Sequence, residues 1–142
     1  MKLFIFVIGL FLAHVFVQGN SNIDERAQEC IKKLNISRES IWSFVVNSTV
    51  DENNEVAVKY FGCILDAYFT DSNELIVNEE YTSFVTTVFA KHFRTEPVLV
   101  RELAEESIQI CKHIKADTKE KTAVQITNCL MKTAKELKNK KL

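Results

Sequence analysis

Apolar positions follow two different patterns along this chain. Residues 3–17 form one nearly continuous apolar run after Lys2, and small residues follow it up to Gly19. A basic residue, an apolar run and small residues in this order are typical of a secretory signal peptide. The run is shorter than the about 20 residues that a membrane-spanning helix needs. We therefore expect a signal peptide over residues 1–19 and a secreted, extracellular domain over residues 20–142, without membrane insertion.

After residue 19, apolar side chains recur every three or four residues, which indicates amphipathic helices. The expected helices cover residues 23–34, 39–46, 56–69, 79–92, 97–114 and 118–137. A polar loop is expected over residues 47–54, where Asp51 or the Thr49–Glu52 pair can start the third helix. Asn78 should cap the fourth helix, Pro97 should open the fifth, and Asp117 with Glu120 resembles a capping box for the sixth.

The composition supports a helical domain and narrows its partners. Only one glycine, Gly62, and one proline, Pro97, follow the leader, whereas sheets joined by tight turns need more of both. Without Lys2, the 18 basic residues become 17 against 19 acidic ones. No basic stripe points to a nucleic-acid partner. The lysines near the C-terminus are explained by a helix end whose dipole they complement.

Four cysteines, Cys30, Cys63, Cys111 and Cys129, follow the leader. In an oxidising compartment, an even number of cysteines in so short a chain indicates a disulfide framework. Four cysteines allow three connectivities, and the residues alone do not select one. The expected helices place these cysteines on the first, third, fifth and sixth of them.

Short helices that carry cysteines in this order resemble the insect odorant-binding protein family. In that family's six-cysteine form, the second cysteine precedes the third by four positions and the fifth precedes the sixth by nine. These positions hold Lys59 and Glu120 here, so the chain is similar to the four-cysteine, or minus-C, branch. The segment from Cys30 to Ile41 and residues 51–63 also follow the family's pattern between its first and third cysteines. The resemblance covers the mature chain, although the 47 residues between Cys63 and Cys111 are a long gap for the family.

The resemblance implies both the disulfides and the overall architecture. The family's order, with one bridge removed, joins Cys30 to Cys63 and Cys111 to Cys129. The missing bridge would join the positions of Lys59 and Glu120. These two residues either form an ion pair, or Glu120 only caps its own helix while Lys59 is solvated. The implied fold is all-α, a compact bundle of about six short helices around an internal hydrophobic cavity, with two disulfides.

The implied function is carriage of small hydrophobic ligands such as odorants, pheromones or lipid-like molecules. Apolar pockets with a few polar anchors suit this task, and ten aromatic residues follow the leader. A membrane chemoreceptor is a further candidate partner, no cofactor is expected, and we expect a monomer or a weak homodimer. The candidate wall residues, taken from their helix faces, are Phe61, Leu65, Tyr68, Phe84, Val88, Leu103, Ile110 and Val124.

Catalysis finds little support in these residues. His92 and His113 are the only histidines after the leader, and Cys111-x-His113 has too few ligands for a zinc site. We therefore expect neither an enzyme nor a metal site. A secreted helical signalling protein of cytokine type is the alternative, since such proteins share the length and the two disulfides. Long helices with crossover loops are typical of that class, whereas the stripes here are short. A salivary or venom protein on the same scaffold is a third reading.

Overall fold

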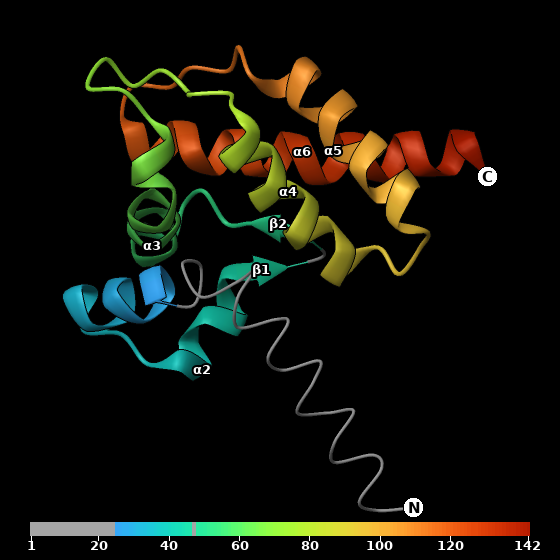
Figure 1. The fold of residues 1–142 in the computed structure, drawn as a ribbon. Coiled ribbons are helices and arrows are strands. Elements are labelled where there is room, and N and C mark those ends of the chain that lie inside the picture. The colour runs from blue at the N-terminus through green and yellow to red at the C-terminus, as the bar shows by residue number, and fades with distance from the viewer. Residues whose placement is uncertain (1–24, 47) are drawn as a thin grey trace, which may run out of the picture.

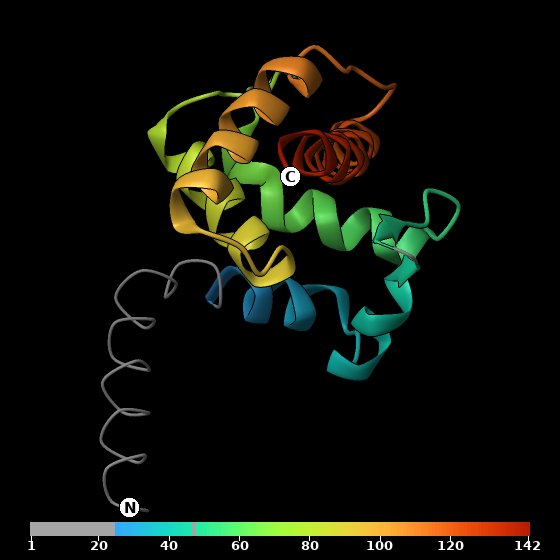
Figure 2. The same cartoon turned by 90° about the vertical axis from the view of Figure 1, so that its right-hand side faces the viewer.

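The structure of the protein, a computed structural model, describes residues 25–46 and 48–142. The long helices are α3 (Glu55–Leu65), α4 (Glu79–His92), α5 (Pro97–Cys111) and α6 (Lys119–Lys141). Figure 1 shows α6 running across the molecule with α5 beside it, and Figure 2 looks along α6, with α3 and α5 on neighbouring sides. The expected all-α class is confirmed. The predicted signal peptide and the predicted start of the first helix at residue 23 lie outside the described residues.

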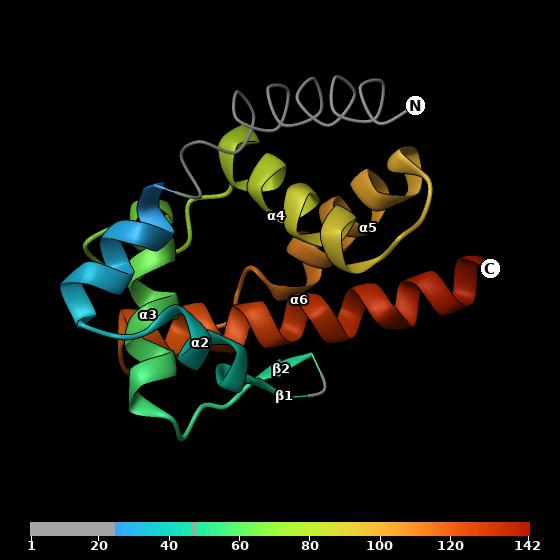
Figure 3. The same ribbon diagram turned by 90° about the horizontal axis from the view of Figure 1, so that it is seen from below.

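Shorter helices and two short strands connect and cover the four long helices. A first helix spans residues 25–34. It is followed by α2 (Arg38–Ile41), η1 (Trp42–Phe44), β1 (Val45–Val46) and β2 (Thr49–Val50), and η2 (Asp66–Tyr68) extends α3. Figure 3 shows the first helix packed beside α3, and the two strands alongside α6.

Polar side chains cap the helices, although not always the expected ones. Asn78 caps α4 as predicted, because its Oδ1 accepts a hydrogen bond from the Tyr81 amide at 2.9 Å. The third helix starts within one residue of the predicted range, but its predicted cap at Asp51 or the Thr49–Glu52 pair is wrong. Asp51 instead closes a turn by accepting from the Asn53 amide at 2.9 Å, so the helix begins after Asn54. The side chain of Asn54 accepts from two amides of the first turn of α3, the usual role of an N-cap.

The cap of the last helix also differs from the prediction. Thr118, with an extended backbone, is the N-cap of α6, and its hydroxyl accepts from the Lys121 amide at 3.2 Å. Asp117 therefore does not form the expected capping box with Glu120. The fifth helix begins at Pro97 as predicted, because the first-turn amides of a helix have no intrahelical partners.

The helix predicted over residues 39–46 is wrong beyond Phe44. Val45 and Val46 form β1, which pairs antiparallel with β2. β-Branched residues favour extended backbone, and Ser48 turns the chain with a left-handed φ of 64°. The side chain of Asn128 on α6 then bonds both backbone groups of Val50, at 2.8 Å to its N and 3.0 Å to its O. A strand therefore occupies part of the predicted polar loop.

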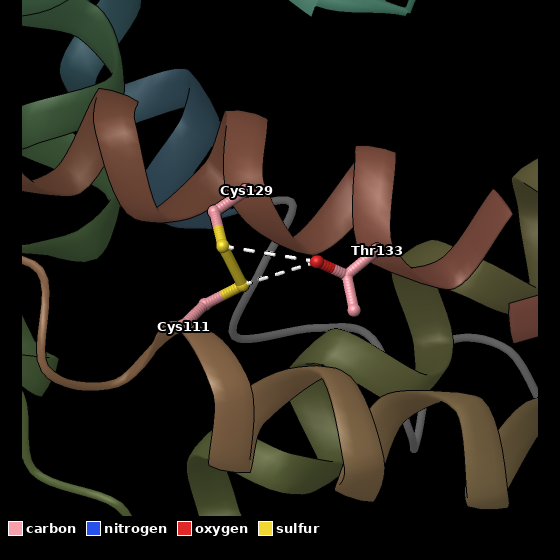
Figure 4. The surroundings of a disulfide bond; sticks show 3 residues. All are labelled: Cys111, Cys129 and Thr133. Atoms are coloured by element: carbon pink, nitrogen blue, oxygen red, sulfur yellow. Dashed lines mark hydrogen bonds between the residues drawn. A yellow bond between two sulfur atoms is a disulfide. The ribbon is translucent and has the colours of Figure 1, made fainter. Parts of the chain in front are cut away.

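Both predicted disulfides are confirmed. Cys30 joins Cys63, and Cys111 joins Cys129. Figure 4 shows the second bridge between α5 and α6, with Thr133 beside it. The Thr133 hydroxyl lies 3.6 Å from the sulfur of Cys111 and 3.8 Å from that of Cys129. Because neither sulfur carries a hydrogen, the hydroxyl is the donor in both contacts.

The buried apolar side chains form two clusters. The main cluster lies between α4, α5, α6 and η2, around fully buried residues such as Phe89, Leu103 and Ile126. The second cluster lies between the first helix, η1, α3 and the start of α6, and includes Phe44 and Tyr60. Ile64 of α3 packs against both. The two clusters therefore meet where α3 crosses α6.

Candidate ligand-binding site

Three aromatic rings at the edge of the main cluster form the best candidate for a ligand-contacting surface. Tyr68 of η2 lies 5.2 Å from Tyr81 and 5.4 Å from Phe84, measured between ring centroids. Tyr68 and Tyr81 are buried, whereas Phe84 is half-buried. Val88, one helical turn after Phe84 on α4, keeps 37% of its surface exposed. The inner rings are thus fixed by the core, and an apolar rim reaches solvent.

Charged groups lie at the same edge. The Arg26 guanidinium of the first helix sits 5.1 Å from the centroid of the Tyr68 ring, within reach of a cation–π interaction. Arg26 also pairs with Glu80 at 3.4 Å, which ties the first helix to the start of α4. Burial raises the pKa of Tyr81, with a smaller contribution from Tyr68. The Tyr81 hydroxyl therefore stays protonated and can serve as a neutral hydrogen-bonding group near the rings.

The predicted wall residues are divided between the two clusters. Leu65, Tyr68 and Leu103 belong to the main cluster, and Phe84 packs against it. Val124 is buried in the second cluster, with Phe61 packed against that one. Val88 is 37% exposed and Ile110 is 59% exposed. The structure therefore gathers Leu65, Tyr68, Phe84 and Leu103 in the main cluster, with Val88 exposed one turn after Phe84, and places Phe61, Val124 and Ile110 elsewhere.

Ser107 is a polar group that the sequence indicated only indirectly. It lies on the buried face of α5, fully enclosed between apolar residues such as Ala104 and Ile108. Its Oγ has no hydrogen-bond partner among the described residues, and leaving a buried hydroxyl unpaired costs about 1–3 kcal/mol. A serine within an apolar helical stripe is the signal that could have identified it.

The positions of the family's missing bridge meet at the crossing of α3 and α6. Lys59 and Glu120 line one cleft of about 250 Å³, together with Gly62 and Asp66. Among the described side chains, Lys59 and Glu120 do not form an ion pair, whereas Asp66 pairs with Lys119 at 3.1 Å. The crossing is therefore held by close packing and by a neighbouring ion pair.

Two features of the described residues concern metal ligands and membrane-spanning helices. Within residues 25–46 and 48–142, His, Cys, Asp and Glu side chains do not gather in threes that could hold a metal ion. None of the helices in these ranges is both long and apolar enough to cross a bilayer.

Comparison with known proteins supplies the family. No curated protein and no solved structure matches the chain significantly. A family model described as the PBP/GOBP family matches residues 14–133, a range that contains all four cysteines and both disulfides. Since this match covers most of the sequence, the chain belongs to the PBP/GOBP family, the insect odorant-binding family.

Proposed function

We propose that this protein is secreted as residues 20–142 and carries a small hydrophobic ligand, such as an odorant, a pheromone or a lipid-like molecule, through extracellular fluid. The match to the PBP/GOBP family over residues 14–133 carries this proposal, because the family consists of carriers of small hydrophobic molecules and not of enzymes. It also favours carriage over cytokine-type signalling. We further propose a membrane chemoreceptor as a second partner and a monomeric or weakly dimeric carrier.

We place the ligand beside the aromatic rim of the main cluster. Tyr68, Phe84 and Leu103 would form its wall, and Val88 would form its outer edge. Leu103 is fully enclosed, whereas Phe84 and Val88 reach the surface, and we therefore propose that the ligand enters past these two side chains. Each methylene buried on binding contributes about 0.8 kcal/mol. A chain of about ten carbons would therefore approach the gross 8 kcal/mol of micromolar binding, before the costs of association.

Ser107 is the polar anchor that we propose for an oxygen-bearing ligand. Its buried Oγ has no partner among the described residues, and a site that offers a hydrogen bond discriminates by polar groups as well as by size. Ser107→Ala should leave the free energy of unfolding unchanged or slightly higher. It should weaken binding of a medium-chain alcohol more than binding of the corresponding alkane.

A displacement assay with an apolar fluorescent probe tests the proposed wall. Val88→Asp places a charge at the rim, and burying it against an apolar ligand should cost at least about 1.4 kcal/mol, or tenfold in affinity. Val98→Asp is the matched control, because Val98 is a 74% exposed valine at the start of α5. Equal probe affinity in the two folded variants would place the ligand away from α4. Failure of every medium-chain alcohol or ester to displace the probe would contradict carriage itself.

A further inference from the structure

A further cleft lies outside the residues of the aromatic rim. It is a cleft of about 420 Å³ between two connections, one leading from η2 to α4 and the other from α5 to α6. Figure 1 shows these connections running beside each other above α3. The volume falls within the range of about 300–1,000 Å³ that small-molecule sites occupy.

One part of the cleft lining is apolar. Leu75 and Ile114 line it from opposite connections, and both are half-buried against the main cluster. Val77 adds a 39% exposed side chain to the same lining. The cleft therefore offers apolar side chains that a short hydrocarbon chain could contact.

Hydrogen bonds fix the backbone on both sides of this cleft. On one side, the Ile76 amide donates to the Tyr68 carbonyl at 2.7 Å, and the Thr70 amide donates to the Glu74 carbonyl at 2.9 Å. On the other side, the Ala116 amide donates to the Thr122 hydroxyl at 2.9 Å. Because these bonds hold both connections, little ordering of the chain is needed for a ligand to bind.

The polar part of the lining carries an excess of positive charge. Lys112, His113 and Lys115 come from the α5–α6 connection, and Glu74 is the acidic residue that faces them. The Lys112 ammonium donates to the neutral amide of Gln109 at 2.7 Å, a contact that leaves its charge uncompensated. Two lysines against one carboxylate favour an anionic group over a neutral or cationic one.

We propose that this cleft binds an amphiphilic carboxylate, with the carboxylate at Lys112 and Lys115 and the hydrocarbon chain along Leu75, Val77 and Ile114. Lysine ammonium groups recognise an anion as mobile point charges, which suits an open cleft with a flexible ligand. This site goes beyond the proposed carrier site, because its lining does not include Tyr68, Phe84 or Ser107. The protein would then bind two chemical classes of apolar molecule at two places.

Calorimetric titration of the secreted full-chain product with sodium octanoate and octan-1-ol tests this proposal. Lys112→Gln with Lys115→Gln should lower the octanoate affinity by between about twofold and about thirtyfold, as expected for the loss of two exposed charge pairs, and leave octanol affinity unchanged. Lys132→Gln with Lys135→Gln is the matched control, since it removes two exposed lysines of α6 and should leave both affinities unchanged. Val77→Ser should weaken octanoate binding without lowering the thermal midpoint.

The outcomes separate this site from the proposed carrier site. Equal octanoate affinity in the wild type and the Lys112/Lys115 variant would overturn the proposal, and so would an equal loss in both double variants. If the Lys112/Lys115 variant has a lower thermal midpoint than the wild type but loses no more affinity for octanoate than for octanol, the two lysines only stabilise the C-terminal end of α5, and the proposal is overturned. If octanol does not bind but octanoate binding depends on Lys112 and Lys115, the carrier proposal is contradicted and the proposal for this cleft stands.

Discussion

Gly62 permits the close approach of α3 and α6, and replacing it by alanine should destabilise the protein. It lies within α3, where its backbone has no positive φ. A Cβ at this position would lie 2.5 Å from Cγ, 2.9 Å from Cβ and 3.0 Å from Cα of Glu120. The Glu120 side chain can rotate away, but its Cα moves only with the backbone of α6. The crossing must therefore widen to accept the methyl group.

Two opposing effects decide the magnitude for Gly62→Ala. Alanine within a helix is favoured over glycine by about 0.5–1 kcal/mol. Forcing an extra methyl group into a packed contact costs about 1–3 kcal/mol. The expected net effect is a loss of about 1 kcal/mol in the free energy of unfolding, or about 4 °C in Tm for a domain of this size. Without the contact to Glu120, the same substitution should raise Tm.

Thermal and urea unfolding followed by circular dichroism measure this balance. The control is a double-mutant cycle with Glu120→Gly, which removes the Cβ and Cγ atoms that the new methyl group would meet. In that background, Gly62→Ala should cost less than in the wild type, so the two changes should be coupled. A variant more stable than the wild type, or an uncoupled cycle, would refute the close approach of these helices.

Three further predictions concern the remaining contacts. Asn128→Ala should lower the free energy of unfolding by about 1–3 kcal/mol, because two hydrogen bonds to β2 are lost. Amide hydrogens of β2 should exchange faster in this variant, and unchanged exchange rates would contradict the role of the Asn128 hydrogen bonds. Lys59→Cys with Glu120→Cys should form a third disulfide on oxidative refolding, and two free thiols in non-reducing peptide mapping would show that the positions are not opposed. Hydrogen bonds from Arg101 lower the pKa of Glu79 below its ordinary 4.5. The resulting stabilisation is therefore present above that value and lost as the pH falls through the lower pKa of the folded state. Glu79→Gln should thus destabilise the protein near neutral pH and not at strongly acidic pH, as urea titrations at both values would reveal.

Local sequence signals predicted the helices well and the short strands poorly. Asn78 and Pro97 act within one turn of the helices that they start, so their roles could be read directly from the sequence. The strand at Val50 depends on Asn128, which lies 78 residues away. A partner that distant leaves no mark in the local pattern. The resemblance to a family, rather than the residues themselves, supplied the disulfide pairing.

The candidate site was less predictable than the fold. The helical stripes predicted that Leu103 and Val124 face inward, and both are fully buried, but they predicted the same of Ile110, which is 59% exposed. The stripe does not show which of the two clusters each residue enters, because that depends on how the helices cross. Arg26 joins the site only through contacts with η2 and α4, and its own helix gives no sign of them.

The placement of the two disulfides divides the molecule mechanically. Cys30 and Cys63 both belong to the second cluster, and Cys111 and Cys129 both belong to the main one. Each bridge therefore restrains one half of the domain, and neither ties the halves to each other. In the six-cysteine pattern that the sequence resembles, a further bridge would join the positions of Lys59 and Glu120, on α3 and α6. Without it, the covalent link between the two clusters is the chain itself, which passes from one cluster to the other within α3 and again within α6.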